Sequence, residues 1–314
     1  HGWHVIAVDV QQSVVDAINE GRSHVTEEPG LAELVATAHV GGRLRATTDG
    51  AAAARDADVV VLIVPVMLDD EQQPDYRYMD AAVASIGPGV HEGSVVVFET
   101  TLPVGDTRHR FTPRLAEMTG LEPDREFFVA FSPERLFSGA VFRNLAAYPK
   151  LVGGIGQAST DRAVAFYAGV LDADVIPMSS AEAAEFSKLA ETTYRDVNIA
   201  LANEFARVGE RLGVDVRQAI DAANSQPYSH VHAPGVGVGG HCIPVYPYFL
   251  AGDDTPLINA SREINDAMAA HAVGKLAEAL GGLAGATVVV LGLAYRAGVK
   301  ESRHSSAFGL VEAL

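Results

Sequence analysis

The sequence has 314 residues, 48% of them hydrophobic, which is enough for a sizeable core, and 23 Lys and Arg against 40 Asp and Glu give a net charge of −17. This charge argues against nucleic acid or an anionic membrane as the main partner, although phosphorylated small molecules, which bind through local donors, remain compatible with it. The longest apolar stretch, Val59–Leu68, is shorter than the ~20 residues that cross a bilayer. The N-terminus has no signal pattern and the single cysteine forms no intrachain disulfide, so we expect a soluble protein of the reducing cytoplasm.

Short β-branched runs alternate with segments of helical spacing, such as Ser13–Glu20 and Thr160–Val170. Continuous runs such as Val-Val-Val-Leu-Ile-Val are typical of parallel strands that are buried on both faces. We therefore predict an α/β fold built on a doubly wound, Rossmann-like parallel sheet. The predicted strands, in chain order, are His4–Val10, Asp58–Val66, Ser94–Glu99, Phe127–Ser132, Asp174–Met178 and Ala286–Leu291.

Two long helices are predicted in the second half of the chain. The first runs from Ser179 to about Gly213 and contains no Gly or Pro before Gly209, and the second runs over Asn259–Leu280. A cluster of glycines then precedes the strand at Ala286–Leu291. This break predicts that another α/β unit begins there.

Both ends of the sequence look cut. Asp9 ends the first predicted strand, where a dinucleotide fold places the acid that binds the adenosine ribose. The glycine loop of that fold lies about 20 residues earlier, beyond the residues present here. The chain also stops at Leu314, one strand and one helix into its last unit, so we expect a partial sequence.

A Gly-x-Gly-x-x-Gly pattern occurs at Gly235, Gly237 and Gly240, but neither a strand before it nor a helix after it is predicted. We interpret it as a flexible loop whose backbone approaches a ligand closely. The loop leads to the only cysteine, Cys242, which stands between two glycines and a proline in Gly-Gly-His-Cys-Ile-Pro. A lone cysteine is most often a small buried hydrophobe, but a rigid, exposed turn suits a nucleophile.

Polar side chains follow two of the predicted strands. Thr100 and Thr101 come after one strand and Glu134 after another, so we expect them at the same edge of the sheet, where open α/β sheets bind ligands. The alternatives are a helix cap for the threonines and a surface ion pair for Glu134. On the first long helix, Lys188, Thr192 and Arg195 share one face, and a solvated charged face is the default expectation.

Together these segments resemble the UDP-glucose/GDP-mannose dehydrogenases, NAD-dependent enzymes that oxidise a nucleotide sugar at C6 to the uronate. The most specific elements are the Cys242 loop and Ser132-Pro133-Glu134-Arg135. The run Arg-Asp-Val-Asn-Ile-Ala-Leu-Ala-Asn-Glu, from Arg195, looks like the branch that acts on UDP-N-acetylmannosamine or UDP-N-acetylglucosamine. The other matching motifs are Glu28-Pro29-Gly30-Leu31, Val64-Pro65-Val66, Thr100-Thr101-Leu102-Pro103-Val104-Gly105, Lys150-Leu151-Val152-Gly153-Gly154, Lys188-Leu189-Ala190-Glu191, Leu291-Gly292-Leu293-Ala294-Tyr295-Arg296 and Ser302-Arg303-His304-Ser305.

The resemblance implies a role for each matching residue. Cys242 is the implied nucleophile, which traps the aldehyde as a thiohemiacetal that becomes a thioester. Lys188 is implied to stabilise the oxyanion, Glu134 to act as base for the hydrolytic water, and Thr101 to hold that water. NAD is the implied cofactor, with Asp9 at its ribose, Arg303 at its pyrophosphate, and Val64, Pro65 and Thr101 as further contacts. The residues implied to bind the nucleotide sugar are Glu134, Arg135, Lys188, Thr192, Gly235, Gly237, Gly239, Gly240, Tyr295 and Arg296.

The resemblance also implies a domain order. Residues 1–178 form the NAD-binding domain, without its first strand and glycine loop. Residues 179–282 form a central helical domain with the cysteine loop, and its long helix forms a homodimer. Residues 283–314 begin the domain that binds the nucleotide of the UDP-sugar.

The implied activity is the two-step oxidation of UDP-N-acetylmannosamine to its uronate, in polysaccharide biosynthesis, with UDP-N-acetylglucosamine and UDP-glucose as alternative substrates. The family commonly has an aspartate where this sequence has Tyr246, and an asparagine where it has Thr192. These two differences leave another alternative, a non-catalytic relative that binds NAD or nucleotide sugar. His230, His232 and His241 lack carboxylate or cysteine partners at suitable spacing, so we expect no metal site.

Overall fold

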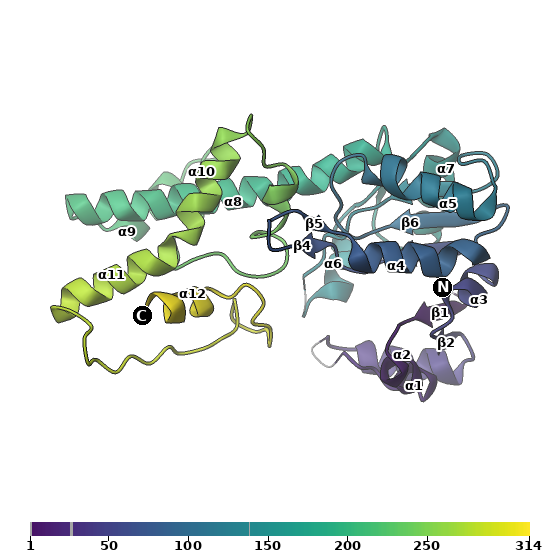
Figure 1. Ribbon diagram of the computed structural model, residues 1–314, viewed down its shortest axis with the longest axis horizontal. Helices are drawn as coiled ribbons and strands as arrows, with labels where there is room; N and C mark the ends of the chain where they lie inside the picture. The colour runs from purple at the N-terminus through teal and green to yellow at the C-terminus, as the bar shows by residue number, and fades with distance from the viewer. Residues whose placement is uncertain (1, 26–27, 138) are drawn as a thin grey trace. The chain divides into compact units, whose positions relative to one another are not determined.

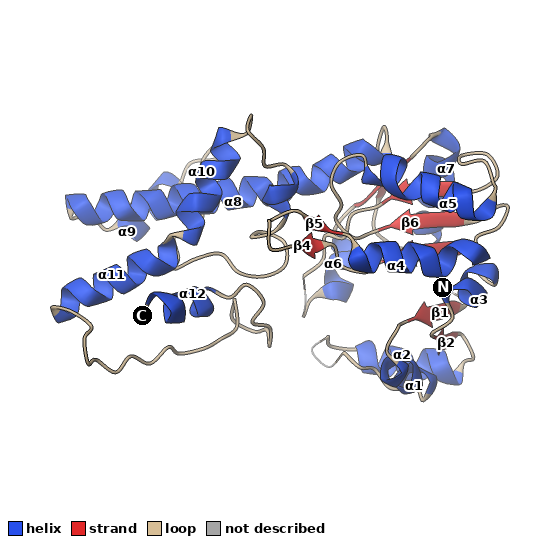
Figure 2. Cartoon of the chain, viewed as in Figure 1, coloured by secondary structure: helices blue, strands red, loops and turns tan. Residues whose placement is uncertain are grey.

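The computed structural model describes residues 2–25, 28–137 and 139–314, which form two compact units, His1–Lys188 and Leu189–Leu314. Every strand among these residues lies in the first unit (Figure 2). The described part of the second unit consists of helices and loops.

The main sheet of the first unit has five strands in the order β3-β6-β7-β8-β9. Its strand β6 is labelled in Figure 1. Their bounds are Val59–Leu62 for β3, Val95–Phe98 for β6, Phe128–Phe131 for β7, Lys150–Gly154 for β8 and Val175–Pro177 for β9. Neighbours run parallel except β7 and β8, which are antiparallel. Two smaller pairs are the parallel β1 (Val5–Val8) with β2 (Leu44–Thr47) and the antiparallel β4 (Met67–Leu68) with β5 (Pro74–Asp75).

Helices connect these strands. In chain order they are α1 (Gln12–Asn19), α2 (Leu31–Val40), α3 (Gly50–Arg55), α4 (Arg77–Ile86), the turn η1 (Gly87–Gly89), the π-helical segment η2 (Thr107–Phe111), α5 (Thr112–Thr119), α6 (Val141–Ala147) and α7 (Gln157–Val170). The described residues between β7 and β8, 132–137 and 139–149, hold only the short α6, and β8 starts at the edge where β7 ends. This short return makes β8 antiparallel in a sheet that is otherwise parallel.

Helices cover both faces of the main sheet, because successive side chains of a strand point to opposite faces. On one face Val97 and Ala130 pack with Tyr167 of α7. On the other face Phe98 of β6 stacks on Phe111 of η2, with ring centroids 5.0 Å apart. The doubly wound α/β architecture predicted from the sequence is therefore confirmed.

The second unit begins within α8 (Ala181–Leu212), the long helix predicted from Ser179 to about Gly213. The elements that follow are α9 (Val216–Ala223), η3 (Tyr246–Phe249), α10 (Pro256–Asp266), α11 (Met268–Leu280) and α12 (Ser306–Ala313). Across the described residues, no helix combines the length and the apolar character that a bilayer crossing requires.

Two predicted elements are wrong. The helix predicted over residues 259–280 is broken at Ala267 into α10 and α11, although the sequence has neither Gly nor Pro there. Residues 286–291 form no strand: Val289 is 72% and Leu291 is 90% exposed. A strand needs a neighbour with which to form its hydrogen-bond ladder, and the described part of the second unit offers none.

Candidate active site

In the first unit, three predicted site segments meet at the carboxyl ends of β3, β6 and β7. The hydroxyl of Thr100 donates to the carbonyl oxygen of Val64 at 2.7 Å, which joins the segments after β6 and β3. The backbone N–H of Glu134 donates to the carbonyl oxygen of Glu99 at 3.1 Å, which joins the segments after β7 and β6. Thr100 therefore ties two loops together and is not a helix cap.

The other predicted residues of this unit lie near strand ends as well. Thr101 is 2% exposed, beside the half-buried Thr100, and Pro65 is exposed after β3. Asp9 follows β1 and is half-buried, and one of its carboxylate oxygens accepts a hydrogen bond from the N–H of Gln11 at 2.8 Å. Arg135 donates from Nη1 to the carbonyl oxygen of Pro149 at 3.3 Å.

The carboxyl of Glu134 is half-buried and accepts a hydrogen bond from the N–H of Leu136. Burial raises the pKa of Glu134 above its ordinary value, while the positive charges of Lys150 and Lys188 oppose that rise and the charge of Glu99 adds to it. A carboxyl with a raised pKa, close to two lysines, is suited to accept a proton from a water molecule near neutral pH. The geometry thus differs from the surface ion pair considered from the sequence.

A buried triad beneath this edge was missed by sequence reasoning. Lys150 Nζ donates to Glu99 Oε1 at 2.8 Å, and the hydroxyl of Tyr167 donates to the same oxygen. The lysine nitrogen also lies 4.8 Å from the centre of the Tyr167 ring. Burial, and then the charge of Glu99, raises the pKa of Tyr167 well above its ordinary value, so its hydroxyl stays protonated and keeps donating. The only signals in the sequence were that Glu99 stands directly before one of the matching motifs and that Lys150 begins another.

The face of α8 that carries Lys188 is not the solvated charged face expected by default. Lys188 is 7% and Thr192 is 2% exposed, while Glu191 and Arg195 are half-buried. The hydroxyl of Thr192 donates to the carbonyl oxygen of Leu189, as helical threonines often do. Removing a lysine from water costs free energy that its interactions must offset, and buried charged groups gather at functional sites, so the burial of Lys188 favours a functional position.

Cys242 belongs to the second unit and is half-buried. Its carbonyl oxygen accepts hydrogen bonds from the N–H of Val245 at 3.3 Å and of Tyr246 at 2.9 Å, which closes the turn that leads into η3. Tyr246 is buried, and its ring centre lies 5.5 Å from that of Phe249. A turn around the cysteine is therefore present, but it was predicted to be exposed, whereas Cys242 is half-buried and the residues that follow it are buried.

The glycine loop before Cys242 packs closely against residues 295–306 of the same unit. A Cβ on Gly239 would lie 2.6 Å from Tyr295 Cβ and 2.8 Å from the His304 carbonyl oxygen. A Cβ on Gly240, whose φ is +98°, would lie 3.0 Å from the Tyr295 ring. The loop was interpreted as flexible and open to a ligand, whereas here the close approach to its backbone is made by the chain itself.

Residue 241 links this loop to a further predicted site residue. Arg303 Nη1 lies 3.2 Å from His241 Nδ1, and His241 Nε2 pairs with Glu301 Oε1. The arginine is the donor to Nδ1, so we assign the ring hydrogen to Nε2, which donates to the carboxylate. Nearby, Arg296 Nε lies 3.4 Å from the Tyr295 hydroxyl, so two predicted sugar-binding residues are neighbours.

A second network missed from the sequence joins α8 to α10 and supports the loop. Arg262 Nη1 donates to Asp196 Oδ1 at 2.6 Å, and Asn265 Nδ2 donates to the same oxygen at 2.8 Å. Asn203 Nδ2 donates to Asn265 Oδ1 at 2.9 Å, and Asn203 Oδ1 accepts from the N–H of Gly235 at 2.9 Å. A chain of buried polar groups thus reaches the start of the glycine loop.

Among residues 2–25, 28–137 and 139–314, no cluster of three or more His, Cys, Asp or Glu side chains is arranged to hold a metal ion.

Known proteins resemble the chain over almost its whole length. It is 36% identical to the UDP-N-acetyl-D-mannosamine dehydrogenase of Pyrococcus horikoshii, over 99% of this chain and 75% of that protein. It is 35% identical to the NDP-N-acetyl-D-galactosaminuronic acid dehydrogenase of Ralstonia nicotianae, over 99% and 74%. The solved structure of the UDP-D-ManNAc dehydrogenase from Pyrococcus horikoshii superposes with a TM-score of 0.91 at 34% identity, covering 99% of this chain and 75% of that one.

Two family models match the chain. Residues 1–171 match the NAD binding domain of the UDP-glucose/GDP-mannose dehydrogenase family, and residues 182–267 match its central domain. These matches confirm the predicted cofactor, NAD, and the predicted enzyme class, an oxidoreductase that acts on a nucleotide sugar. The chain therefore belongs to the UDP-glucose/GDP-mannose dehydrogenase family, the NAD-dependent nucleotide-sugar dehydrogenases.

Proposed function

We propose that the protein oxidises UDP-N-acetyl-D-mannosamine at C6 to the uronate in two NAD-dependent steps. The observation that carries this choice of substrate is the match, over 99% of the chain, to a relative named UDP-N-acetyl-D-mannosamine dehydrogenase. The run that starts at Arg195, in which Asp196 and Asn203 form the buried network, supports the same branch of the family.

In the proposed reaction the alcohol at C6 becomes an aldehyde, which the thiolate of Cys242 attacks to form a thiohemiacetal. Oxidation of that adduct gives a thioester, and water then breaks the carbon–sulfur bond, releasing the carboxylate and the thiolate. NAD, when bound, accepts a hydride from C6 in each oxidation, so two NADH form per sugar. Lys188 stabilises the oxyanion of the adducts, and Thr101 holds the hydrolytic water whose proton Glu134 accepts. The burial of Lys188 and the raised pKa of Glu134 support these roles.

The residues proposed for NAD are Asp9, Val64, Pro65, Thr101 and Arg303. Asp9 suits the ribose because it follows a parallel strand and offers a carboxylate to the hydroxyl groups. For the nucleotide sugar we propose Glu134, Arg135, Lys188, Thr192, Gly235, Gly237, Gly239, Gly240, Tyr295 and Arg296. Tyr295 and Arg296 combine an aromatic ring with a guanidinium, which suits a uridine diphosphate group.

We further propose that residues 1–178 bind NAD, that residues 179–282 supply the cysteine and a homodimer contact through α8, and that residues 283–314 contribute to the nucleotide-sugar site. An apolar groove between α8 and α9, lined by Phe205, Leu212 and Ile220, supports the contact between two copies. A single cysteine with no disulfide partner supports a cytoplasmic location.

The test is incubation of the purified protein and NAD with UDP-N-acetylmannosamine, UDP-N-acetylglucosamine, UDP-N-acetylgalactosamine and UDP-glucose in parallel. We expect the highest kcat/KM with UDP-N-acetylmannosamine and two NADH per sugar consumed. If none of the four sugars yields NADH while calorimetry detects binding, the non-catalytic alternative motivated by Tyr246 and Thr192 is correct. A Cys242→Ala protein that still makes uronate would contradict the thioester route alone.

A further inference from the structure

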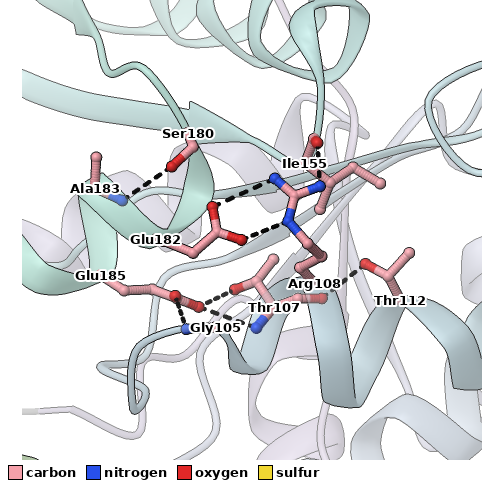
Figure 3. Close-up of polar contacts among 9 residues, drawn as sticks. All are labelled: Gly105, Thr107, Arg108, Thr112, Ile155, Ser180, Glu182, Ala183 and Glu185. Atoms are coloured by element: carbon pink, nitrogen blue, oxygen red, sulfur yellow. Dashed lines mark hydrogen bonds and ion pairs between the residues drawn. The ribbon is translucent and has the colours of Figure 1, made fainter.

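Glu185 lies in the second turn of α8, and Figure 3 shows the residues around it. Its side chain is fully buried, at 0% exposure. Its carboxylate accepts three hydrogen bonds from one short segment. The N–H of Gly105 donates to Oε2 at 2.6 Å. The N–H and the hydroxyl of Thr107 donate to Oε1 at 3.0 and 2.6 Å. The roles proposed above leave this carboxylate without a function.

The donors stand where the segment after β6 turns into a helix. Residues 100–105 include Thr101, and Gly105, at a φ of +96°, precedes the start of η2 at Thr107. The first N–H groups of a helix have no partner within the helix, so a carboxylate that accepts from them fixes the helix start. The hydroxyl of Thr112 donates to the Thr107 carbonyl oxygen at 2.7 Å, which tightens the same turn.

Glu185, which accepts these three hydrogen bonds, lies on α8, the helix that also carries Lys188. Lys188 follows Glu185 by three residues, so the two side chains lie on the same face of α8. The far end of the segment is fixed too, because Thr100 is bonded to Val64 beside Thr101. One buried carboxylate therefore sets the spacing between the Thr101 segment and the turn of α8 that carries Lys188.

An ion pair lies beside Glu185, but its two side chains do not bind the backbone at the start of η2. Arg108 pairs with Glu182, and its guanidinium also donates to the carbonyl oxygen of Ile155 (Figure 3). The Glu182 side chain is 27% exposed and contacts the side chain of Arg108. Glu185 instead contacts the backbone before and at the start of η2. Glu182 therefore provides a matched control on the same helix.

The charge state of Glu185 matters to this geometry. Burial raises the pKa of Glu185 to about 7, against the lowering effect of the hydrogen bonds from Thr107 and Gly105. The charged groups around it are Asp106 and Arg108 at the start of η2 and Lys188 on α8. Only the ionised carboxylate accepts all three bonds, because a protonated carboxyl must donate and only the Thr107 hydroxyl can accept in return.

We propose that Glu185 is a positioning residue for the dehydrogenase reaction, holding the segment that carries Thr101 against the turn of α8 that carries Lys188. The inference rests on the roles proposed for Thr101 and Lys188. It predicts that loss of the carboxylate lowers kcat and leaves the binding of NAD and sugar largely intact, because Glu185 is fully buried and is not among the residues proposed to bind either.

The test compares the parent protein with Glu185→Gln, Glu182→Gln, Thr107→Val and Thr107→Ser. An amide replaces one acceptor oxygen by a donor that faces an N–H, so we expect kcat of Glu185→Gln to fall about tenfold or more, with both KM values within about threefold. Glu182→Gln stays within about twofold of the parent. Thr107→Val loses roughly threefold and Thr107→Ser regains the parent rate, because serine restores the hydroxyl.

Two readouts separate positioning from general damage. In the parent, we expect the ionisation of both Glu134 and Glu185 to contribute to the rise of kcat with pH, and only the contribution of Glu185 is lost in Glu185→Gln. Hydrogen exchange by mass spectrometry is expected to show exchange about tenfold faster in residues 100–107 of Glu185→Gln, with the β6 and β7 peptides unchanged. If Glu185→Gln does not fold, the Thr107→Val and Thr107→Ser pair decides.

Unchanged kcat, pH profile and exchange in Glu185→Gln would overturn the inference. So would an equal loss in Glu182→Gln, or a Thr107→Ser protein as slow as Thr107→Val. If the parent makes no NADH from any of the four sugars, the proposed function fails, and exchange in residues 100–107 then decides separately whether Glu185 holds the segment.

Discussion

The central strands of the first unit and the contact between α8 and α10 in the second unit bury different kinds of side chain. In the first unit the central strands β6 and β7 are apolar and buried along their whole length, with Phe98 and Phe131 at 0% exposure. In the second unit the buried residues that join α8 to α10 are polar, with Asp196 at 0% and Arg262 at 4% exposure. Burial of apolar surface is non-directional, whereas a buried charge needs its partners in place.

The two kinds of buried contact hold the site residues of each unit in place in different ways. The first unit extends its site residues from the ends of a packed sheet, whose apolar core tolerates replacement by residues of similar volume. The second unit holds its glycine loop through Asn203, which depends in turn on Asn265 and the Asp196–Arg262 pair. We therefore expect the second unit to be the more sensitive to single polar substitutions, and the following changes test that expectation.

The largest effect is expected for Arg262→Ala. It leaves Asp196 buried without its cation, which costs about 4 kcal/mol of unfolding free energy, confined to the second unit. Urea unfolding combined with hydrogen exchange in α8 and α10 measures the loss. Lys275→Ala is the control, because the Lys275–Glu210 pair is exposed and contributes under about 1 kcal/mol. Equal losses for the two variants would refute the comparison.

A core truncation in the first unit is expected to cost somewhat less. Leu115 of α5 is 0% exposed, so Leu115→Ala should reduce the unfolding free energy by about 3 kcal/mol through the cavity that it leaves. Leu257→Ala, at a position that is 66% exposed, should change it by less than about 0.5 kcal/mol. The idea that the units are independently packed fails if Leu115→Ala speeds exchange in α10 as much as in α5.

A smaller effect is expected at the glycine loop. Gly239→Ala drives a methyl group into Tyr295 and His304 and should cost about 2 kcal/mol. Gly274 of α11 is exposed and has no atom within 4 Å of an added Cβ, so Gly274→Ala should stabilise the second unit by up to about 1 kcal/mol. Thermal unfolding of both proteins shows the opposite signs, and the same sign for both would argue against the packing described here.

The smallest effect is a pH dependence in the first unit. The hydrogen bond from Arg108 lowers the pKa of Glu182 from 4.5 to about 2. A carboxyl with a lowered pKa stabilises the fold above its unfolded pKa, and this contribution disappears as the pH falls from about 4.5 towards 2. Because both side chains are partly exposed, we expect only about 0.5–1 kcal/mol between the parent and Glu182→Gln at pH 7, shrinking at pH 3. Unfolding curves at both values check this, and a gap that widens in acid would contradict it.

Much of the first unit was predictable because several of its strands are continuous runs of β-branched residues in the sequence. The strand β2, Leu-Arg-Ala-Thr, and the strand β8, Lys-Leu-Val-Gly-Gly, lack such runs and were missed. Residues 286–291 have a strand composition but form no ladder, so composition alone gave the wrong answer there. The break at Ala267 follows no Gly or Pro and has no local signal.

The candidate site was predictable to the extent that its residues sit in recognisable motifs. Such motifs contain Cys242, Lys188 and Glu134. The catalytic roles of these residues stay predictions. The Glu99–Lys150–Tyr167 triad, the Asp196–Arg262 pair and Glu185 were missed, because their partners are 51 to 80 positions away along the chain. No local pattern reports which distant donor reaches a buried carboxylate.

The close packing of residues 295–306 on the glycine loop has a consequence for the order of events during synthesis. Gly237, Gly239 and Gly240 receive their neighbours Ser306, Tyr295 and His304 from a part of the chain that leaves the ribosome later. Domains fold largely in N-terminal order as the chain is made, at about 5–20 residues per second. The first unit can therefore be complete while the loop before Cys242 still lacks the neighbours that pack on its glycines.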